Sequence, residues 1–267
     1  MRTKSKWLQL RRDIPAPLYR ALAVAGFAVA FLIWWWCSTR PDVNKVFLPH
    51  PAQVAETAKQ FLFEPRFWQD VWVSVWRVTA GFLLATAIAL PLGILMGSLR
   101  TGEALFQPLM EFVRYIPVPA LIPILMLLFG LGEMPKIMLI FVGTFFQLVL
   151  MVADEIRRVP YEMLQASYTL GASRKETVRL VLWRAARPGI FDALRLCNGW
   201  AWTYLVVAEL VAANEGLGYR ILKFSRFLQT PKIFVYLIVL GVIGLLLDFL
   251  FRQFNARIFH WADTTRR

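Results

Sequence analysis

Long apolar runs, separated by short polar stretches, dominate the pattern of the chain. A helix needs about 20 mostly apolar residues to cross the roughly 30 Å hydrocarbon core of a bilayer. Four runs approach or reach that length without an acidic or basic residue, and each predicts a membrane-spanning helix. These runs are residues 21–39, 78–99, 115–132 and 137–153.

Two further apolar runs have a similar length but contain charged residues. Residues 186–212 contain Arg187, Asp192, Arg195 and Glu209, and residues 233–251 contain Asp248. With these two runs, the chain is predicted to be an all-α, polytopic membrane bundle of about six transmembrane helices.

The composition agrees with a membrane protein. Of the 267 residues, 58% are hydrophobic, and the mean hydropathy is +0.54, which exceeds the apolar share of an ordinary soluble domain. The first run ends in the bulky sequence FLIWWWC instead of the small residues of a signal-peptide cleavage site, so it is expected to stay as an anchor. Cys37 and Cys197 both lie in apolar runs, which argues against a disulfide framework or a metal site.

The formal net charge of +13 would suit a nucleic-acid-binding protein. With six spans and a cytoplasmic N-terminus, however, the cytoplasmic segments hold about twice as many Lys and Arg residues as the outer segments. This bias predicts that both termini lie in the cytoplasm. The basic balance is therefore mainly a signal of topology, and no nucleic-acid partner is expected.

The predicted spans divide the chain into three parts. Residues 1–20 form a basic cytoplasmic segment, residues 21–252 the transmembrane domain, and residues 253–267 a cytoplasmic tail. Within the transmembrane domain, residues 38–70 form a periplasmic loop with a short helix at 51–63, residues 100–107 a short loop, and residues 154–189 a cytoplasmic loop.

The third predicted span is unusual because it is rich in proline. It contains Pro117, Pro119 and Pro123 and ends in FGLG. Proline removes a helical hydrogen bond, and a lipid bilayer tolerates the freed carbonyl only where protein or water satisfies it. This span is expected to be kinked or broken and to face the interior of the bundle.

The cytoplasmic loop predicts two short helices joined by a glycine turn. Pro160 suits the first turn of a helix, and Gly171 suits the left-handed position that ends one. Ser173 stands three residues before Glu176, the spacing of a capping box that begins a second helix. Apolar positions of this second helix follow the i, i+3, i+4, i+7 rule from Val178, while basic residues occupy its other faces.

Three roles fit such an element. A basic amphipathic helix beside a bilayer can be an interfacial anchor on anionic lipid. A DNA-binding helix-turn-helix is disfavoured, because both helices are tied within a few residues to membrane spans. The third role is docking of a cytoplasmic partner that moves the spans.

The loop resembles the EAA motif of permease subunits in ATP-binding-cassette (ABC) importers. The matching positions are Gln165, Ala166, Ser167 and Gly171, followed by Val181. Gln165 replaces the acidic residue of that motif, and Arg184 stands where its proline usually falls, with Pro188 four residues further on. The residues that the resemblance assigns to ATPase coupling are Gln165, Ala166, Ser167, Leu170, Gly171, Ala172, Ser173, Arg174 and Glu176.

Other segments extend the resemblance to the nitrate, sulfonate, taurine and bicarbonate group of these permeases. They include FLPHPAQV at 47–54, SVWRVTAGFLLATAIALPLGILMG, PLMEFVRYIPVPALIPILMLLFGLGE and GWAWTYLVVAELVAANEGLGYRI. The resemblance implies a MetI-like, type I importer fold in the bacterial inner membrane, with a second permease copy, two ABC ATPase subunits and a periplasmic or lipid-anchored substrate-binding protein. It also implies a small solute as cargo, such as nitrate, bicarbonate, taurine or another sulfonate, or a related small organic anion.

The chain contains no GxxxxGK[ST] phosphate-binding loop. ATP and Mg are therefore expected in the partner ATPase, and no catalytic, cofactor or metal site is expected in this chain. An ion-coupled secondary transporter is the alternative, but the inverted repeats expected of that class do not stand out. The motifs of an intramembrane enzyme, HExxH and GxSxG, are missing from the sequence.

Two stripes of residues at helical spacing, each of which carries polar groups, mark a candidate translocation pathway together with Arg114, because polar groups in a bilayer usually face the bundle interior or water. These residues are Arg114, Thr144, Gln147, Met151, Arg195, Asn198, Trp202, Leu205 and Glu209. The alternative is that they hold helices together through interhelical hydrogen bonds. Helical spacing would also let Arg114 pair with Glu111, Arg195 with Asp192, and Asp248 with Arg252. For the aromatic residues Trp200, Trp202 and Tyr204, packing or interfacial anchoring is favoured.

Overall fold

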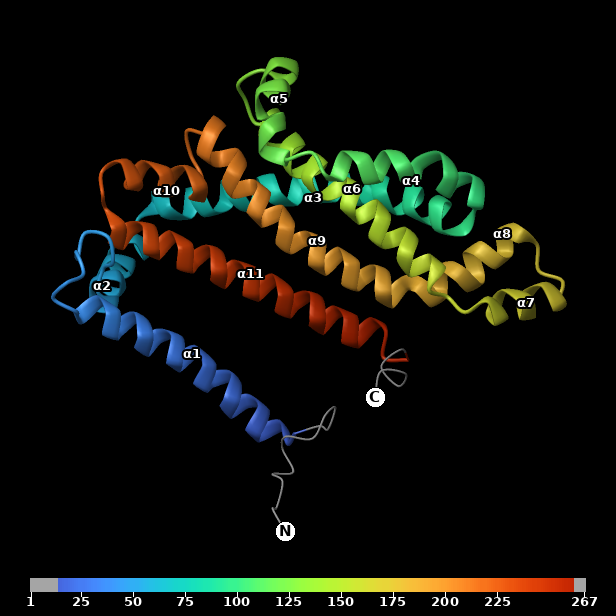
Figure 1. The fold of residues 1–267 in the computed structure, drawn as a ribbon, viewed down its shortest axis with the longest axis horizontal. Helices are drawn as coiled ribbons and strands as arrows, with labels where there is room; N and C mark the ends of the chain where they lie inside the picture. Colours follow the sequence, from blue (N-terminus) through green and yellow to red (C-terminus); the bar gives the residue numbers. More distant parts are fainter. Residues whose placement is uncertain (1–13, 262–267) are drawn as a thin grey trace, which may run out of the picture.

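The long helices lie side by side along one axis of the molecule (Figure 1). The structure is a computed structural model that describes residues 14–261, and within that range it contains helices and no strand. The longest helices are α3 (Pro65–Ser98), α6 (Met134–Arg157), α9 (Trp183–Ala212) and α11 (Thr230–Ile258). The all-α bundle expected from the sequence is confirmed.

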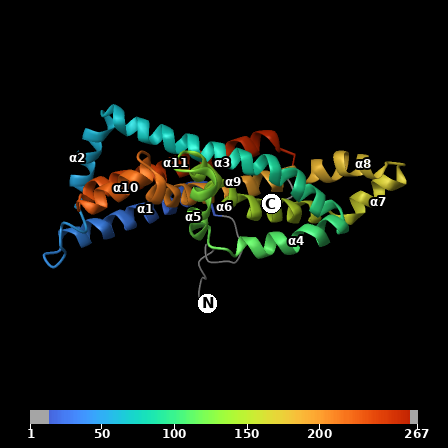
Figure 2. The ribbon, with the colours of Figure 1, turned by 90° about the horizontal axis from the view of Figure 1, so that it is seen from above.

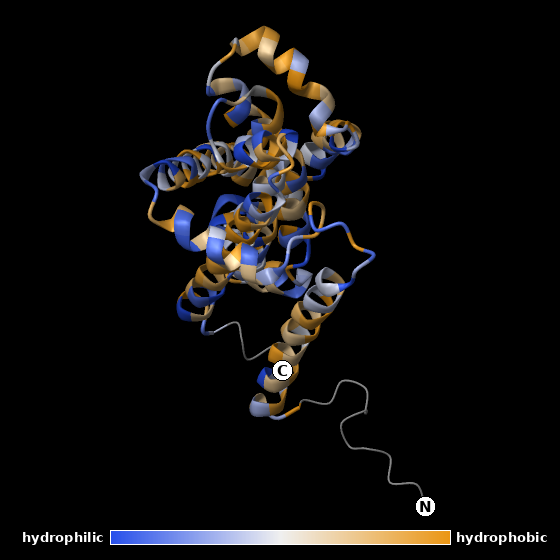
Figure 3. Cartoon of the chain, turned by 90° about the vertical axis from the view of Figure 1, so that its left-hand side faces the viewer, coloured by the Kyte–Doolittle hydropathy of each residue, from blue (hydrophilic) through white to orange (hydrophobic). Residues whose placement is uncertain are grey.

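Four described helices are long and apolar enough to cross a membrane: α1 (Ala16–Thr39), α3, α6 and α11. A fifth crossing is possible if the bent pair Arg100–Arg114 and Val118–Phe129 is one span. Helix α9 lacks a sufficiently apolar window because of its charged residues, although its 30 residues extend about 45 Å. In Figure 3, apolar residues cover most of α1 and of α5 (Ile122–Phe129), the short helix at the top of the view.

The third predicted span is broken, as its prolines indicate. Helix α4 (Arg100–Arg114) ends before Pro117, a 3-10 turn (Val118–Leu121) leads into α5, and the two parts are bent by 92°. The prediction of a loop at 100–107 is wrong, because α4 begins at Arg100. No residue in 100–107 interrupts a helix strongly, whereas Pro117 forces the residue before it out of the helical conformation.

Four short helices lie at the two ends of the bundle, whereas α5 projects from its middle (Figures 1 and 2). Helices α2 (Pro51–Leu62) and α10 (Leu217–Arg226) lie at one end, and α7 (Tyr161–Thr169) and α8 (Arg174–Glu176) extend from the other. Helix α2 confirms the short helix expected near 51–63, and His50 begins it with a capping box.

The two predicted terminal segments are described only in part. Residues 1–13 and 262–267 lie outside the described residues. Helix α1 begins at Ala16, inside the predicted cytoplasmic segment, and α11 continues to Ile258, inside the predicted tail. Helix α1 therefore begins before the apolar run at 21–39, and α11 extends beyond the apolar run at 233–251.

Helices α3 and α6 pack closely because small residues recur every four positions on α3. These residues are Gly81, Ala85, Ala89, Gly93 and Gly97. A Cβ at Gly81, Gly93 or Gly97 would lie only 2.6–2.9 Å from atoms of α6, including side-chain atoms of Ile140, Val152 and Ile156. Small residues let two helix backbones approach, which is how helices gain packing energy where apolar surroundings offer little hydrophobic drive.

An ion cluster, buried except at Glu133, ties the helices together at the end that carries α10. It contains three carboxylates and three cations: Asp70, Arg77, Glu133, Lys136, Glu209 and Arg220. Arg77 on α3 has no exposed side-chain surface. It donates to Glu133 at 2.5 and 2.8 Å, to Glu209 at 2.7 Å and to the carbonyl of Glu215 at 2.8 Å.

The same cluster holds the turn between α9 and α10. Asp70 accepts hydrogen bonds from the Gly216 N–H at 2.9 Å and from Arg220 at 2.6 Å. Glu209 accepts from the Gly218 N–H at 2.7 Å and from the Ser74 hydroxyl at 2.8 Å. At the N-terminus of α10, the N–H groups of Gly216 and Gly218 are therefore satisfied by carboxylates, and the Leu217 N–H donates to the Ser74 hydroxyl at 2.9 Å. The carboxylates also favour the positive end of the helix dipole.

Replacing Gly216 by alanine should destabilise the protein by about 2–5 kcal/mol. Gly216 has φ +113° and ψ 165°, a conformation that glycine alone adopts easily, and its added Cβ would lie 2.3 Å from Oε1 of Glu209. The measurement is the thermal unfolding midpoint of the detergent-solubilised protein. Gly241→Ala on α11 is the matched control, because a Cβ there meets nothing within 4 Å. Equal midpoints for the two variants would contradict the prediction.

Acid should remove the stabilisation that Glu133 provides. The hydrogen bond from Arg77, aided by Lys136, lowers the pKa of Glu133 from 4.5 to about 2, against the opposing effect of burial. A lowered pKa means that the contribution is complete above pH 4.5 and is lost as the pH falls towards about 2.

The test compares the unfolding midpoints of the parent chain and Glu133→Gln from neutral pH down to about 2. The difference between them should shrink as the solution is acidified. Glu56→Gln is the control, because it also removes one carboxylate, but from the exposed face of α2. A difference that stays constant over this pH range would refute the assignment.

Candidate functional site: a cavity at the broken helix and an exposed coupling element

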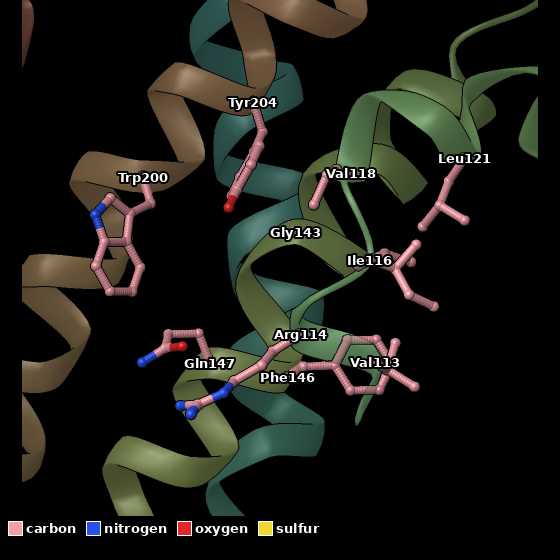
Figure 4. A pocket seen from close by; sticks show the side chains of 11 residues that line it. Val113, Arg114, Ile116, Val118, Leu121, Gly143, Phe146, Gln147, Trp200 and Tyr204 are labelled. Atoms are coloured by element: carbon pink, nitrogen blue, oxygen red, sulfur yellow. The ribbon is translucent and has the colours of Figure 1, made fainter. Parts of the chain in front are cut away.

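A cavity of about 260 Å³ lies beside the break between α4 and α5 (Figure 4). Helix α4 and the turn after it form one wall, α6 a second and α9 a third. The side chains with polar groups are Arg114, Gln147, Trp200 and Tyr204, and the apolar ones are Val113, Ile116, Val118, Leu121, Val142 and Phe146. The cavity exists because the chain leaves its helix after Arg114 and cannot fill the space beside α6.

Arg114 lies at the end of α4 and is exposed. Its guanidinium lies over the ring of Tyr115, 4.9 Å from the centroid, and donates a hydrogen bond to the Tyr115 hydroxyl at 3.1 Å. Figure 4 shows Arg114 and Gln147 pointing into the same space from two facing elements. The side chain of Glu111, the alternative partner considered for Arg114, accepts a hydrogen bond from Gln107 instead.

Trp200 and Tyr204 reach the cavity from α9, one helical turn apart (Figure 4). Tyr204 can do so because Gly143 on α6 has no side chain. A Cβ at Gly143 would lie 2.5 Å from the Tyr204 ring. The sequence favoured packing for these two aromatic residues, and the structure places them in the cavity wall.

Of the nine predicted pathway residues, Arg114 and Gln147 line this cavity. Three others are buried in the bundle: Trp202 and Leu205 belong to the hydrophobic core, and Glu209 belongs to the ion cluster. Their regular spacing on α9 marks the face that packs on the neighbouring helices, not a face towards the cavity.

The remaining predicted pathway residues contact their own or neighbouring helices. The Thr144 hydroxyl donates to the carbonyl of Ile140 at 2.7 Å, and Met151 lies 3.7 Å from the sulfur of Cys197. Arg195 lies 3.5 Å from Asp248, which also pairs with Arg252 at 2.5 Å. Asn198 is half-buried.

The contact between Asp248 and Arg252 confirms the pair expected from helical spacing. No sequence pattern identified Asp248, which lies on α11, as the partner of Arg195 on α9. In the described range 14–261, no group of three or more His, Cys, Asp or Glu side chains is placed to hold a metal ion.

The coupling element, residues 161–176, has the predicted form of helix, glycine turn and helix. Helix α7 is followed by Gly171 at φ +84°, and Ser173 and Glu176 form both halves of the capping box before α8. The hydrogen bonds from the side chain and backbone of Ser173 lower the pKa of Glu176. The second helix differs from the expectation in one respect, because it continues without a break into α9 through a π-helical segment, Thr177–Leu182.

The predicted coupling residues are mostly accessible. Leu170, at the tip of the element, is 88% exposed, and Gln165, Ala166 and Arg174 are also exposed. Ala172 is half-buried and Ser167 is buried. Exposed Tyr161, Met163 and Tyr168 add apolar surface to α7. An exposed apolar and basic surface of this kind suits a protein partner more than it suits water.

Known proteins resemble this chain over most of its length. The family described as "Binding-protein-dependent transport system inner membrane component" matches residues 89–260. A probable ABC transporter permease protein of Brucella abortus is 34% identical over 242 residues, 91% of this chain and 96% of that protein. The taurine transport system permease protein TauC of Escherichia coli is 31% identical over 252 residues, 92% of each.

A solved structure shares the fold. A chain of the inward-facing MetNI methionine ABC transporter matches with a TM-score of 0.67 at 22% identity, over 73% of this chain and 98% of that chain. The expected MetI-like fold is thus confirmed, and the alternative of an ion-coupled secondary transporter is not supported. The chain belongs to the inner membrane components of binding-protein-dependent transport systems, and it is the permease subunit of an ABC importer whose ATP is hydrolysed by separate subunits.

Proposed function

We propose that the cavity beside the broken helix is part of the translocation pathway and that it passes a small organic anion, such as a sulfonate or carboxylate with a short apolar portion. The observation that carries this proposal is the position of Arg114. It is the one charged residue among those that line the cavity, all of which are described, and its side chain and that of Gln147 point to the same side of the cavity in Figure 4. A guanidinium binds planar or tetrahedral oxyanions through two parallel hydrogen bonds, and an amide can add a third.

The rest of the cavity wall favours an anion with an organic part. Besides Arg114 and Gln147, only Trp200 and Tyr204 carry a polar side-chain atom, and the other lining side chains are aliphatic or aromatic. Nitrate or bicarbonate would face this apolar part of the wall with a charged oxygen, and such contacts do not replace the water that a small charged group loses. An organic anion can turn its charged end to Arg114 and its carbon atoms to Trp200, Tyr204 and Phe146. One relative is named as a taurine transport system permease protein, and taurine carries a sulfonate group on a short carbon chain.

The coupling element is where the ATPase would act. Two ATPase subunits would receive α7 and α8 of two copies of this chain, and a periplasmic or lipid-anchored binding protein would deliver the anion at the end that carries α2 and α10. Membrane lipid would surround the exposed apolar helices. In this arrangement both termini lie in the cytoplasm, as the distribution of Lys and Arg predicts. Closure of the ATPase dimer would then switch the bundle between inward-facing and outward-facing forms.

Removing the cation from the cavity should slow transport. Arg114→Ala should reduce uptake of the organic anion about tenfold or more, because a charge-assisted hydrogen bond is worth about 1.5–3 kcal/mol. Arg114→Lys should retain more uptake, since it keeps the charge but loses the planar fork. Uptake is measured in proteoliposomes that contain the complete transporter, with Arg20→Ala on the exposed face of α1 as the control. Unchanged uptake in Arg114→Ala would reject the proposed role.

A methyl group at Gly143 should displace the Tyr204 ring and narrow the cavity. Gly143→Ala is therefore expected to reduce uptake and to cost about 1–3 kcal/mol of stability through overpacking. The matched test is a double-mutant cycle. In a Tyr204→Leu background the ring is gone, so the added methyl should cost much less, giving a coupling of at least about 0.5 kcal/mol. Strict additivity would mean that the two residues do not contact in the working protein.

A further inference from the structure

We infer that Ser167 and Thr177 are positioning residues that make the coupling element one rigid unit, and that the π-helical segment Thr177–Leu182 is the joint between this unit and α9. The inference rests on the proposed docking of an ATPase on α7 and α8. It concerns how the movement reaches the cavity, not whether docking occurs.

A pair of buried hydroxyl groups joins the two halves of the coupling element. Ser167 is 8% exposed and Thr177 is 0% exposed, although most of their neighbours are exposed. Their hydroxyl oxygens lie 3.0 Å apart. The Ser167 hydroxyl also contacts the Leu164 carbonyl at 2.8 Å, and the Thr177 hydroxyl contacts the Ser173 carbonyl at 3.1 Å. The two hydroxyl groups have two protons for these three contacts, so one hydroxyl donates to the other, which donates to the carbonyl on its own helix. This buried hydrogen bond, shielded from competing water, favours one arrangement of α7 against the helix that follows.

The backbone of the turn is fixed as well. The Ala172 N–H donates to the Ser167 carbonyl at 3.0 Å, and the Gly171 N–H donates to the Tyr168 carbonyl at 2.9 Å. This is the pattern of a Schellman motif, which ends a helix with glycine in the left-handed conformation. With the capping box of Ser173 added, residues 164–177 are held by side-chain and backbone hydrogen bonds on both sides of the turn.

The helix becomes irregular immediately after this unit. Thr177–Leu182 is π-helical, and the Trp183 N–H donates to the Val178 carbonyl, five residues back. Hydrogen bonds of this kind are rare in proteins, occur mostly as short insertions in α-helices and are found frequently at functional sites. Pro188 follows within α9 and removes one further helical hydrogen bond. The backbone between Thr177 and Pro188 is therefore the weakest part of the path from the coupling element to α9.

The part of α9 beyond this joint carries the cavity residues Trp200 and Tyr204. Its far end is held by Glu209 in the ion cluster. A push on the rigid coupling element would bend the chain at the π-helical segment and tilt α9 about its fixed end, which would move the two aromatic side chains against α6. If the coupling element were soft, it would absorb the push, and ATP would be hydrolysed without transport.

The test measures anion uptake per ATP hydrolysed, in proteoliposomes that contain the complete transporter. Thr177→Val keeps the shape of the side chain and removes its hydroxyl. We expect it to bind the ATPase subunits in co-purification and to hydrolyse ATP, but to lose uptake per ATP about tenfold. Thr177→Ser keeps a hydroxyl and should restore most of the coupling. Thr169→Val is the matched control, because the exposed Thr169 hydroxyl donates to the Gln165 carbonyl of its own helix.

The possible outcomes separate this inference from the proposed function. If the parent chain brings down no ATPase, the docking proposal fails, and this inference fails with it. If Thr177→Val binds the ATPase subunits normally and its anion uptake per ATP hydrolysed is unchanged, only the inference of a rigid coupling element fails. Should Thr177→Val not fold, Ser167→Ala removes the same contact and carries the test.

Hydrogen exchange of the parent chain supplies an independent measurement. Backbone amides of residues 178–183 should exchange faster than those of residues 189–196 in the α-helical part of α9, because weaker hydrogen bonds open more often. Slower or equal exchange in the π-helical segment would overturn its role as the joint.

Discussion

The buried guanidinium of Arg77 is the constraint on which the arrangement of the bundle depends. Its side chain is removed from solvent, and a buried charge is tolerated only when hydrogen bonds and opposite charges replace the lost water. Glu133, Glu209 and the Glu215 carbonyl supply these from three different parts of the chain. Because all three must meet one planar group, α3, the start of α6 and the end of α9 have little freedom relative to one another.

The position of the cavity follows from this constraint. Glu133 is the residue directly before α6, so its contact with Arg77 fixes where the chain returns after the broken helix. The break at Pro117 opens a space that α4 and α5 do not fill, and the close packing of α3 on α6 holds the opposite wall. Arg114 and Gln147 are polar groups at the edge of that space, and Gly143 leaves room for Tyr204 to complete it.

Helix α9 links the cavity to the coupling element and has different properties at its two ends. At one end it is held by the ion cluster, and at the other it begins in a π-helical segment next to a rigid helix-turn-helix. A helix that is fixed at one end and compliant at the other can tilt without unfolding. This is the mechanical basis on which we propose that a movement outside the membrane reaches Trp200 and Tyr204.

The spans, the broken helix and the capping box could be predicted from the sequence alone, because each depends on residues that are close together in the chain. Apolar runs showed the spans, Pro117 showed the broken helix, and the spacing of Ser173 and Glu176 showed the capping box. The cavity lining and the ion cluster were decided only by the tertiary structure. Arg77 and Glu209 are 132 residues apart, and no periodic pattern tells which face of α9 meets the core and which meets the cavity. That choice depends on how closely α3 and α6 approach, which is a property of packing between distant segments and not of any one of them.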